Sequence, residues 1–214
     1  MIPTICVVAN KSNAGKTTLV EKLIAALTGE GYKVGSIKFT SHVFDPDTEG
    51  KDTWKHTRAG AYATALATPG KTALFVPREN AADIDELVYE YFTLADIVIG
   101  EGGKEQNCPK IKILTDEDTL PEPDDGDVLF YVCDRKIESD RDVFRRDDIE
   151  GMVGFLKDKY FQYVSRSEVR VWMDGKFLAI KPFVKAFIGQ TIKGMLRSLK
   201  GGKNAEKIHI KIGR

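Results

Sequence analysis

The segment from Ala9 to Leu19, which reads ANKSNAGKTTL, constrains the fold of this chain more than any other feature. The apolar run Ile2 to Ala9 precedes it and predicts a strand buried on both faces, as in a parallel sheet. Apolar residues spaced by three or four over Lys16 to Thr28 predict an amphipathic helix after it. A second strand is predicted over Tyr32 to Phe39, so the first 40 residues read as a βαβ unit.

The turn between this strand and helix matches the second half of the phosphate-binding pattern G-x-x-x-x-G-K-[ST]. Backbone N–H groups of such a loop bind phosphates, and the helix N-terminus adds a favourable partial charge. We expect Lys16 to reach the β- and γ-phosphates and the Thr17 hydroxyl to bind Mg²⁺. The expected nucleotide-binding residues of this loop are Asn13, Ala14, Gly15, Lys16, Thr17 and Thr18.

Asn10 stands where the pattern has its first glycine. Glycine permits a positive φ or a close phosphate approach, and Asn is the residue that next best tolerates the left-handed region. The first half of the loop is therefore nonstandard. The alternative is a chance match at a helix N-terminus, but the buried strand before the turn and the amphipathic helix after it favour phosphate binding.

A metal–triphosphate site also needs a carboxylate at the carboxyl end of a neighbouring strand, where ligands collect in parallel sheets. The segment Asp96 to Gly100 predicts such a strand, and Glu101 follows it directly. Asp96 lies at the other end, roughly 16 Å away at about 3.3 Å per residue. We therefore assign metal binding or water positioning, the single catalytic candidate, to Glu101 and expect Asp96 to be a solvated strand start.

The remaining patterns predict an α/β domain with a mainly parallel sheet over residues 1–164. Pro69-Gly70 predicts a hairpin between residues 63–68 and 72–76. Further helices are expected at 52–61, 82–94 and 147–160, and further strands at 110–114 and 128–133.

Residues 165–214 change in period and charge and predict a small ββαβ module. Its expected elements are strands at 169–173 and 177–180 around Asp174-Gly175, a helix at 184–199 and a strand at 208–212. Residues 161–214 hold twelve Lys and Arg against three Asp and Glu, a net of +9 in a chain whose total is zero. The basic face is either a docking surface for an anionic partner or a solvated surface that offsets the acidic remainder.

Bulk properties fit a cytoplasmic globular protein. Hydrophobic residues make up 42% and charged residues 30%. No apolar run reaches the roughly 18 residues of a membrane span, and no signal peptide is expected at the N-terminus. The three cysteines are far apart in sequence, which argues against a zinc ribbon or disulfide framework. Nucleic acid binding is not favoured, because the basic residues lack interleaved aromatics.

The chain resembles the molybdopterin-guanine dinucleotide biosynthesis protein B (MobB) family over about residues 2–165. The matching motifs agree in order and spacing. They are S-N-A-G-K-T-T-L at 12–19, I-K at 37–38 with His42, Asp47-x-x-Gly50-Lys51-Asp52, Arg58-Ala59-Gly60-Ala61, D-I-V-I-G-E-G at 96–102, Lys104, and Pro109-Lys110-Ile111. Asn10 departs from the family pattern, as do Phe39 and Ser41, which replace histidines.

The resemblance implies a P-loop NTPase fold and a homodimer. It implies a GTP- and Mg²⁺-binding accessory protein of molybdenum-cofactor maturation, at most a weak GTPase, that assists a molybdopterin guanylyltransferase. Molybdopterin itself is a further candidate ligand. Lys38 and Asp52, with His42 and Asp47, would face the triphosphate. Asp134 is either a guanine-reading acceptor or a cap.

Two other function classes remain open. A small-molecule kinase would need lid arginines over the phosphates, and residues 134–147 contain Arg135, Arg141, Arg145 and Arg146. A nickel metallochaperone GTPase would need a Cys/His cluster, whereas the chain has only three histidines.

Overall fold

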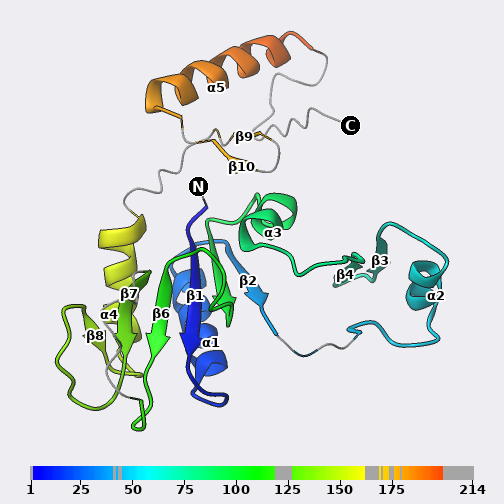
Figure 1. Ribbon diagram of the computed structural model, residues 1–214. Coiled ribbons are helices and arrows are strands. Elements are labelled where there is room, and N and C mark those ends of the chain that lie inside the picture. The colour runs from blue at the N-terminus through cyan, green and yellow to red at the C-terminus, as the bar shows by residue number, and fades with distance from the viewer. Residues whose placement is uncertain are drawn as a thin grey trace.

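The computed structural model describes residues 2–40, 42, 45–118, 127–161, 169, 171–173, 176–178 and 180–199. A six-stranded sheet in the order β2-β5-β1-β6-β7-β8 forms its centre (Figure 1), and all five strand pairs are parallel. Its strands are β1 (Thr4–Ala9), β2 (Val34–Lys38), β5 (Ile97–Glu101), β6 (Lys110–Ile113), β7 (Val128–Val132) and β8 (Val143–Phe144). The predicted α/β class with a mainly parallel sheet is confirmed.

Strand β1 lies inside the sheet, between β5 and β6, and all six of its residues are buried. Its apolar sequence suits this position, because helices cover both faces of a parallel sheet. The sequence analysis did not include β8. That strand has only two residues, too few for any apolar period to be visible.

Helices α1 (Lys16–Gly29) and α4 (Ile149–Phe155) cover one face, and a π-helical turn, η1 (Leu156–Tyr160), continues α4. Helix α3 (Ile84–Tyr91) covers the opposite face. Side-chain caps begin two of these helices, since Asp83 accepts from the backbone N–H of Asp85 at 2.8 Å and Asp148 from that of Gly151 at 3.0 Å. Helices therefore pack on both faces of the sheet and enclose β1 between them.

An arm formed by α2 (Asp52–Arg58), β3 (Thr64–Ala67) and β4 (Thr72–Phe75) extends away from the sheet beyond β2 (Figure 1). Among the residues that the structure describes, β3 and β4 pair only with each other, as the predicted hairpin, and α2 contacts β3. Large apolar side chains on this arm are exposed: Tyr62, Leu66 and Leu74.

The C-terminal region contains the predicted hairpin and helix. β9 (Trp172–Met173) pairs antiparallel with β10 (Lys176–Phe177), and α5 (Pro182–Arg197) follows. β10 lies against α3 of the main body. The strand predicted at 208–212 lies outside the described residues, so the complete ββαβ module and its boundary at residue 165 stay predictions. No helix among the described residues is long and apolar enough to span a membrane.

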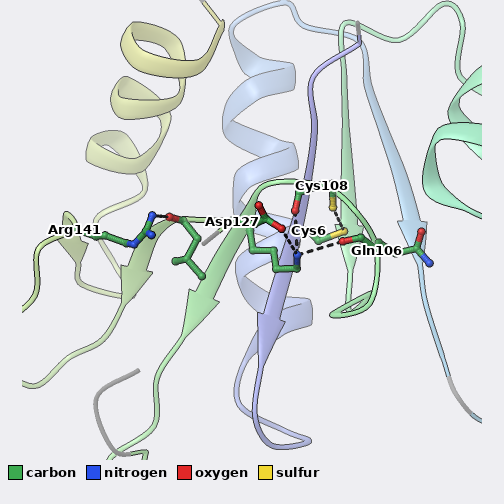
Figure 2. A network of polar contacts seen from close by, with 7 residues as sticks. Cys6, Gln106, Cys108, Asp127 and Arg141 are labelled. Carbon is green, nitrogen blue, oxygen red and sulfur yellow. Dashed lines mark hydrogen bonds and ion pairs between the residues drawn. The ribbon is translucent and has the colours of Figure 1, made fainter. Parts of the chain in front are cut away.

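A polar network fixes the segment that enters β6 (Figure 2). The Lys110 ammonium donates to the backbone oxygens of Gln106 and Cys108, both at 3.2 Å, and lies 3.5 Å from a carboxylate oxygen of Asp127. The Sγ atoms of Cys6 and Cys108 are 2.9 Å apart, so the same segment also packs onto the middle of β1. These contacts set the position of β6 beside β1.

Candidate functional site

Because the six strands are parallel, the segments that follow them meet at one edge of the sheet, which we call the carboxyl edge. The loop from β1 to α1, residues 10–15, lies at its centre. The segments after β2 and β5 flank this loop on one side, and those after β6, β7 and β8 flank it on the other. Residues distant in sequence therefore converge on the β1–α1 loop.

The β1–α1 loop has the backbone expected of a phosphate-binding turn. Gly15 has a φ of 89° and precedes the first helical residue, and Asn13 has a φ of 57°. The Lys16 ammonium donates to the backbone oxygen of Lys11 at 3.1 Å, so the loop folds around its own lysine. This geometry leaves the N–H groups at the start of α1 without a side-chain cap, as an anion-binding helix start requires.

Three predicted site residues meet beside this loop. The Thr17 hydroxyl donates to Glu101 Oε1 at 2.8 Å, and Lys38 Nζ lies 3.2 Å from the same oxygen. Strand register produces the meeting, because Glu101 pairs with Lys38 on β2 and with Val7 on β1. The Glu101 side chain is 14% exposed, whereas that of Lys38 is 67% exposed.

This donor set fits a magnesium-bound triphosphate. A hydroxyl and a carboxylate are hard oxygen ligands, and Mg²⁺ takes one or two protein oxygens and completes its shell with waters and substrate phosphates. Among the described residues, no group of three or more His, Cys, Asp or Glu side chains could hold a metal alone. Thr17 and Glu101 would thus hold the ion only together with a nucleotide.

Arg146, from the segment after β8, ties the loop to the neighbouring strand ends. Its Nη1 donates to the backbone oxygen of Ala14 at 2.7 Å, and its Nη2 donates to that of Leu114 at 3.2 Å. Its Nε lies 3.1 Å from Asp134 Oδ2. The sequence suggests Arg146 only as a lid residue, because no local pattern links Arg146 to Ala14, 132 residues away.

Asp134 is occupied by this arginine through both carboxylate oxygens. Oδ2 faces the Arg146 Nε, and Oδ1 accepts from the Arg146 backbone N–H at 3.1 Å. The arrangement favours the capping interpretation of Asp134, since each of its carboxylate oxygens already faces a protein donor.

Asp118, after β6, is a buried acidic residue that the sequence analysis missed. Its Oδ2 accepts from the backbone N–H of Thr115 at 2.6 Å and from the Thr115 hydroxyl at 2.8 Å. Its Oδ1 accepts from the Asn10 amide at 2.9 Å. The Thr115 backbone N–H is the main cause that lowers the pKa of Asp118 to about 2. An ionised carboxylate therefore lies directly behind the β1–α1 loop.

The other predicted residues lie apart from the loop. Asp52 begins α2, which lies on the far side of the β3–β4 hairpin (Figure 1). Asp47 supports the start of that helix, because its Oδ1 accepts from the Thr53 hydroxyl at 2.9 Å. The backbone N–H of His42 donates to the Thr40 hydroxyl. Within one copy of the chain, Asp52 therefore lies on the arm and not beside the β1–α1 loop.

Comparison with known proteins agrees with this geometry. Residues 4–134 match the profile of the family described as "Molybdopterin guanine dinucleotide synthesis protein B". An Escherichia coli protein named molybdopterin-guanine dinucleotide biosynthesis adapter protein is 34% identical over 162 residues, covering 73% of this chain and 92% of its own. The crystal structure of Bacillus subtilis MobB has a TM-score of 0.57 and 26% identity, covering 73% of this chain and 99% of its own.

A longer relative comes from Methanocaldococcus jannaschii. It carries a provisional description as a molybdopterin-guanine dinucleotide biosynthesis adapter protein and is 31% identical over 223 residues. The alignment covers 94% of this chain and 93% of the relative, so it extends into the C-terminal region, whereas the Escherichia coli alignment covers 73% of the chain. From its fold, its β1–α1 loop and these matches, the chain belongs to the molybdopterin-guanine dinucleotide synthesis protein B (MobB) family.

Proposed function

We propose that this protein is a GTP-binding adapter in molybdopterin guanine dinucleotide biosynthesis, with at most weak GTP hydrolysis, that assists a molybdopterin guanylyltransferase. Family membership and the adapter names of its relatives support the pathway. Three free cysteines, Cys6, Cys108 and Cys133, suit a reducing cytoplasm.

The contact between Thr17 and Glu101 carries the nucleotide-binding part of this proposal. It joins the first turn of α1 to the carboxyl end of β5, 84 residues away, through two groups that have the chemistry of Mg²⁺ ligands. Lys16 lies one residue before Thr17. Among the described residues its ammonium group donates one hydrogen bond, to the Lys11 backbone oxygen, and a phosphate would replace that acceptor. The proposed site consists of the loop, Glu101 and Lys38, and it does not include Asp52.

Hydrolysis would depend on the carboxylate oxygen of Glu101 that faces neither Thr17 nor Lys38. Its Oε1 already accepts from Thr17 and lies beside Lys38, which leaves Oε2 to orient a water molecule. Bound Mg²⁺ would neutralise negative charge on the phosphates. Preference for GTP rests on family membership, because both oxygens of Asp134 already face Arg146.

The kinase alternative receives no support from three of the four arginines that suggested it. Arg135 donates to the backbone oxygen of Asp118, and Arg141 donates to that of Val128. Arg146 is bound to the loop backbone, and Arg145, which is exposed and pairs with Asp147 at 3.4 Å, is the one of the four with an accessible guanidinium group. A kinase lid needs guanidinium groups that are available to phosphate oxygens.

A homodimer is part of the proposal, and the arm supports it. An isolated two-stranded hairpin is marginally stable in water, and β3–β4 has no other strand partner among the described residues. Tyr62 is 88% exposed, Leu66 51% and Leu74 49%, which is an apolar surface that a second copy would bury. Light scattering of the full chain and of Leu66→Lys would test this. A wild-type monomer would contradict it.

Nucleotide binding is tested by titrating the full chain with fluorescent GTP and ATP analogues, with Mg²⁺ and with a chelator. We expect Mg²⁺-dependent binding of GTP that exceeds binding of ATP and is abolished in Lys16→Ala, whose thermal unfolding should match wild type. Rapid phosphoryl transfer from ATP to a small acceptor would contradict the adapter function. Adapter function itself is tested by calorimetry with the guanylyltransferase of the same organism, with and without GTP.

A further inference from the structure

The residue that replaces the first glycine of the phosphate-binding pattern connects two charged groups. The Asn10 amide nitrogen donates to Asp118 Oδ1 at 2.9 Å, and its amide oxygen accepts from the Lys104 ammonium at 3.2 Å. Asn10 is the first residue of the β1–α1 loop, so this connection lies at one end of the loop that forms the proposed triphosphate site.

The orientation of the Asn10 amide is determined by its two neighbours. A carboxylate only accepts hydrogen bonds and an ammonium group only donates them. The amide must therefore turn its nitrogen to Asp118 and its oxygen to Lys104. Asp118 is 8% exposed and is itself held by the backbone N–H and hydroxyl of Thr115. Its strongly lowered pKa keeps it ionised across the physiological range.

The chain between Glu101 and Lys104 brings the lysine to this position. Gly102 and Gly103 have φ values of 81° and 74°, which permit a tight turn at the end of β5. A Cβ on Gly103 would lie 2.7 Å from the Phe39 ring, so only glycine fits this turn. Lys104 is exposed, and among the described residues it forms no ion pair with a carboxylate. Its charge is thus available to an incoming anion.

The position of Lys104 favours the terminal phosphate. Mg²⁺ in nucleotide sites bridges the β- and γ-phosphates. Glu101, the proposed metal-side carboxylate, lies three residues before Lys104 in the same turn. Lys104 thus shares the metal side of the phosphate chain, whereas the start of α1 faces the phosphates nearer the ribose.

We propose that Lys104 is a second phosphate-binding lysine, held ready by Asn10, that binds the terminal phosphate and lets the site distinguish GTP from GDP. This inference rests on the proposed nucleotide function. Because the Asn10 amide is uncharged, a phosphate oxygen competes successfully for the ammonium group. Aspartate at position 10 would instead hold Lys104 in an ion pair. Asn10 is therefore a positioning residue and Lys104 a ligand-contacting one.

The test measures dissociation constants of GTP and GDP, each with Mg²⁺, by calorimetry on the full chain. We expect Lys104→Met to weaken GTP binding about tenfold, which is the effect of losing one charge-assisted hydrogen bond. GDP binding should weaken by less than about twofold. Lys104→Arg should retain most of the discrimination. Lys33→Met, at an exposed position at the opposite edge of the sheet, is the matched control and should change neither constant.

Asn10 is tested in the same assay. Asn10→Asp should weaken GTP binding more than GDP binding. Asn10→Gly should lower the ratio of GTP affinity to GDP affinity when Lys104 is present, but not in the Lys104→Met background. Equal weakening of GTP and GDP in Lys104→Met, or no weakening, would overturn the role of Lys104. Unchanged GTP affinity in Asn10→Asp would overturn that of Asn10. A wild-type chain that binds neither nucleotide would instead remove the proposed function itself.

Discussion

The Thr17 hydroxyl lies 2.8 Å from Glu101 Oε1, although 84 residues separate the two along the chain. The contact arises because β1 and β5 are adjacent parallel strands. The loop and α1 follow the carboxyl end of β1, and Glu101 lies at the carboxyl end of β5, paired with Val7 of β1. The hydroxyl and the carboxylate that we propose as Mg²⁺ ligands are therefore in hydrogen-bond contact.

Thr17→Ala and Glu101→Gln should both reduce the advantage that Mg²⁺ gives to GTP binding. We expect at least about a tenfold loss of affinity with Mg²⁺, equivalent to roughly 1.4 kcal/mol, and little change with a chelator. Titrations with a fluorescent GTP analogue at several Mg²⁺ concentrations measure this. An equal loss with and without Mg²⁺ would mean that the pair supports the loop rather than the metal.

Arg146→Ala should destabilise the β1–α1 loop, because the backbone oxygens of Ala14 and Leu114 lose their donors. Leaving such acceptors unpaired costs about 1–3 kcal/mol in the free energy of unfolding. Arg145→Ala is the matched control, since its pair with Asp147 is exposed and should contribute less than about 1 kcal/mol. Chemical denaturation measures both. Equal effects would contradict the loop role of Arg146.

Gly100→Ala should destabilise the centre of the sheet, because a Cβ there would lie 2.7 Å from Cys6 Sγ and 3.3 Å from the Phe39 ring. Overpacking of this kind costs about 1–3 kcal/mol. Cys6→Ala in the same chain should restore part of the loss by removing the sulfur. Gly154→Ala in α4, where a Cβ meets nothing within 4 Å, should instead stabilise by about 0.5–1 kcal/mol. Thermal and chemical unfolding of Gly100→Ala, Cys6→Ala, the double variant and Gly154→Ala measures these effects, and additive losses in the double variant would contradict the contact between Gly100 and Cys6.

Asp118 should make stability depend on pH in the acid range. Its pKa is lowered from 3.8 to about 2 in the folded chain, so its contribution is present above about pH 4 and is lost as pH falls toward 2. Asp118→Asn should lower stability at neutral pH by about 1–2 kcal/mol and flatten the curve between pH 4 and 2. Asp116→Asn, at an exposed position, is the control. Parallel acid curves for wild type and Asp118→Asn would contradict this assignment.

The main strands and helices of residues 1–164 could be predicted from the sequence because the patterns that indicate them involve only neighbouring residues. The apolar run of β1, the period of α1, the Pro69-Gly70 turn and the G-K-T-T segment each depend on neighbouring residues. Strand direction alone also predicts that Glu101 lies at the carboxyl end of β5 and Asp96 at the opposite end, and the structure has them there. The Asp96 carboxylate accepts from the Lys33 backbone N–H at 2.9 Å. β8 was missed because two residues carry no period.

By itself, the sequence determined the α/β class, the parallel βαβ beginning and the residues of the glycine-containing turn between β1 and α1, since these follow from backbone conformation and apolar period. Only the tertiary structure decided which distant groups meet at the carboxyl edge. It placed Arg146 on the loop backbone, Asp118 behind Asn10 and Asp52 out on the arm. The physical reason is strand order, because hydrogen-bonded neighbours in the sheet are selected by packing over the whole chain and leave no mark in the local sequence.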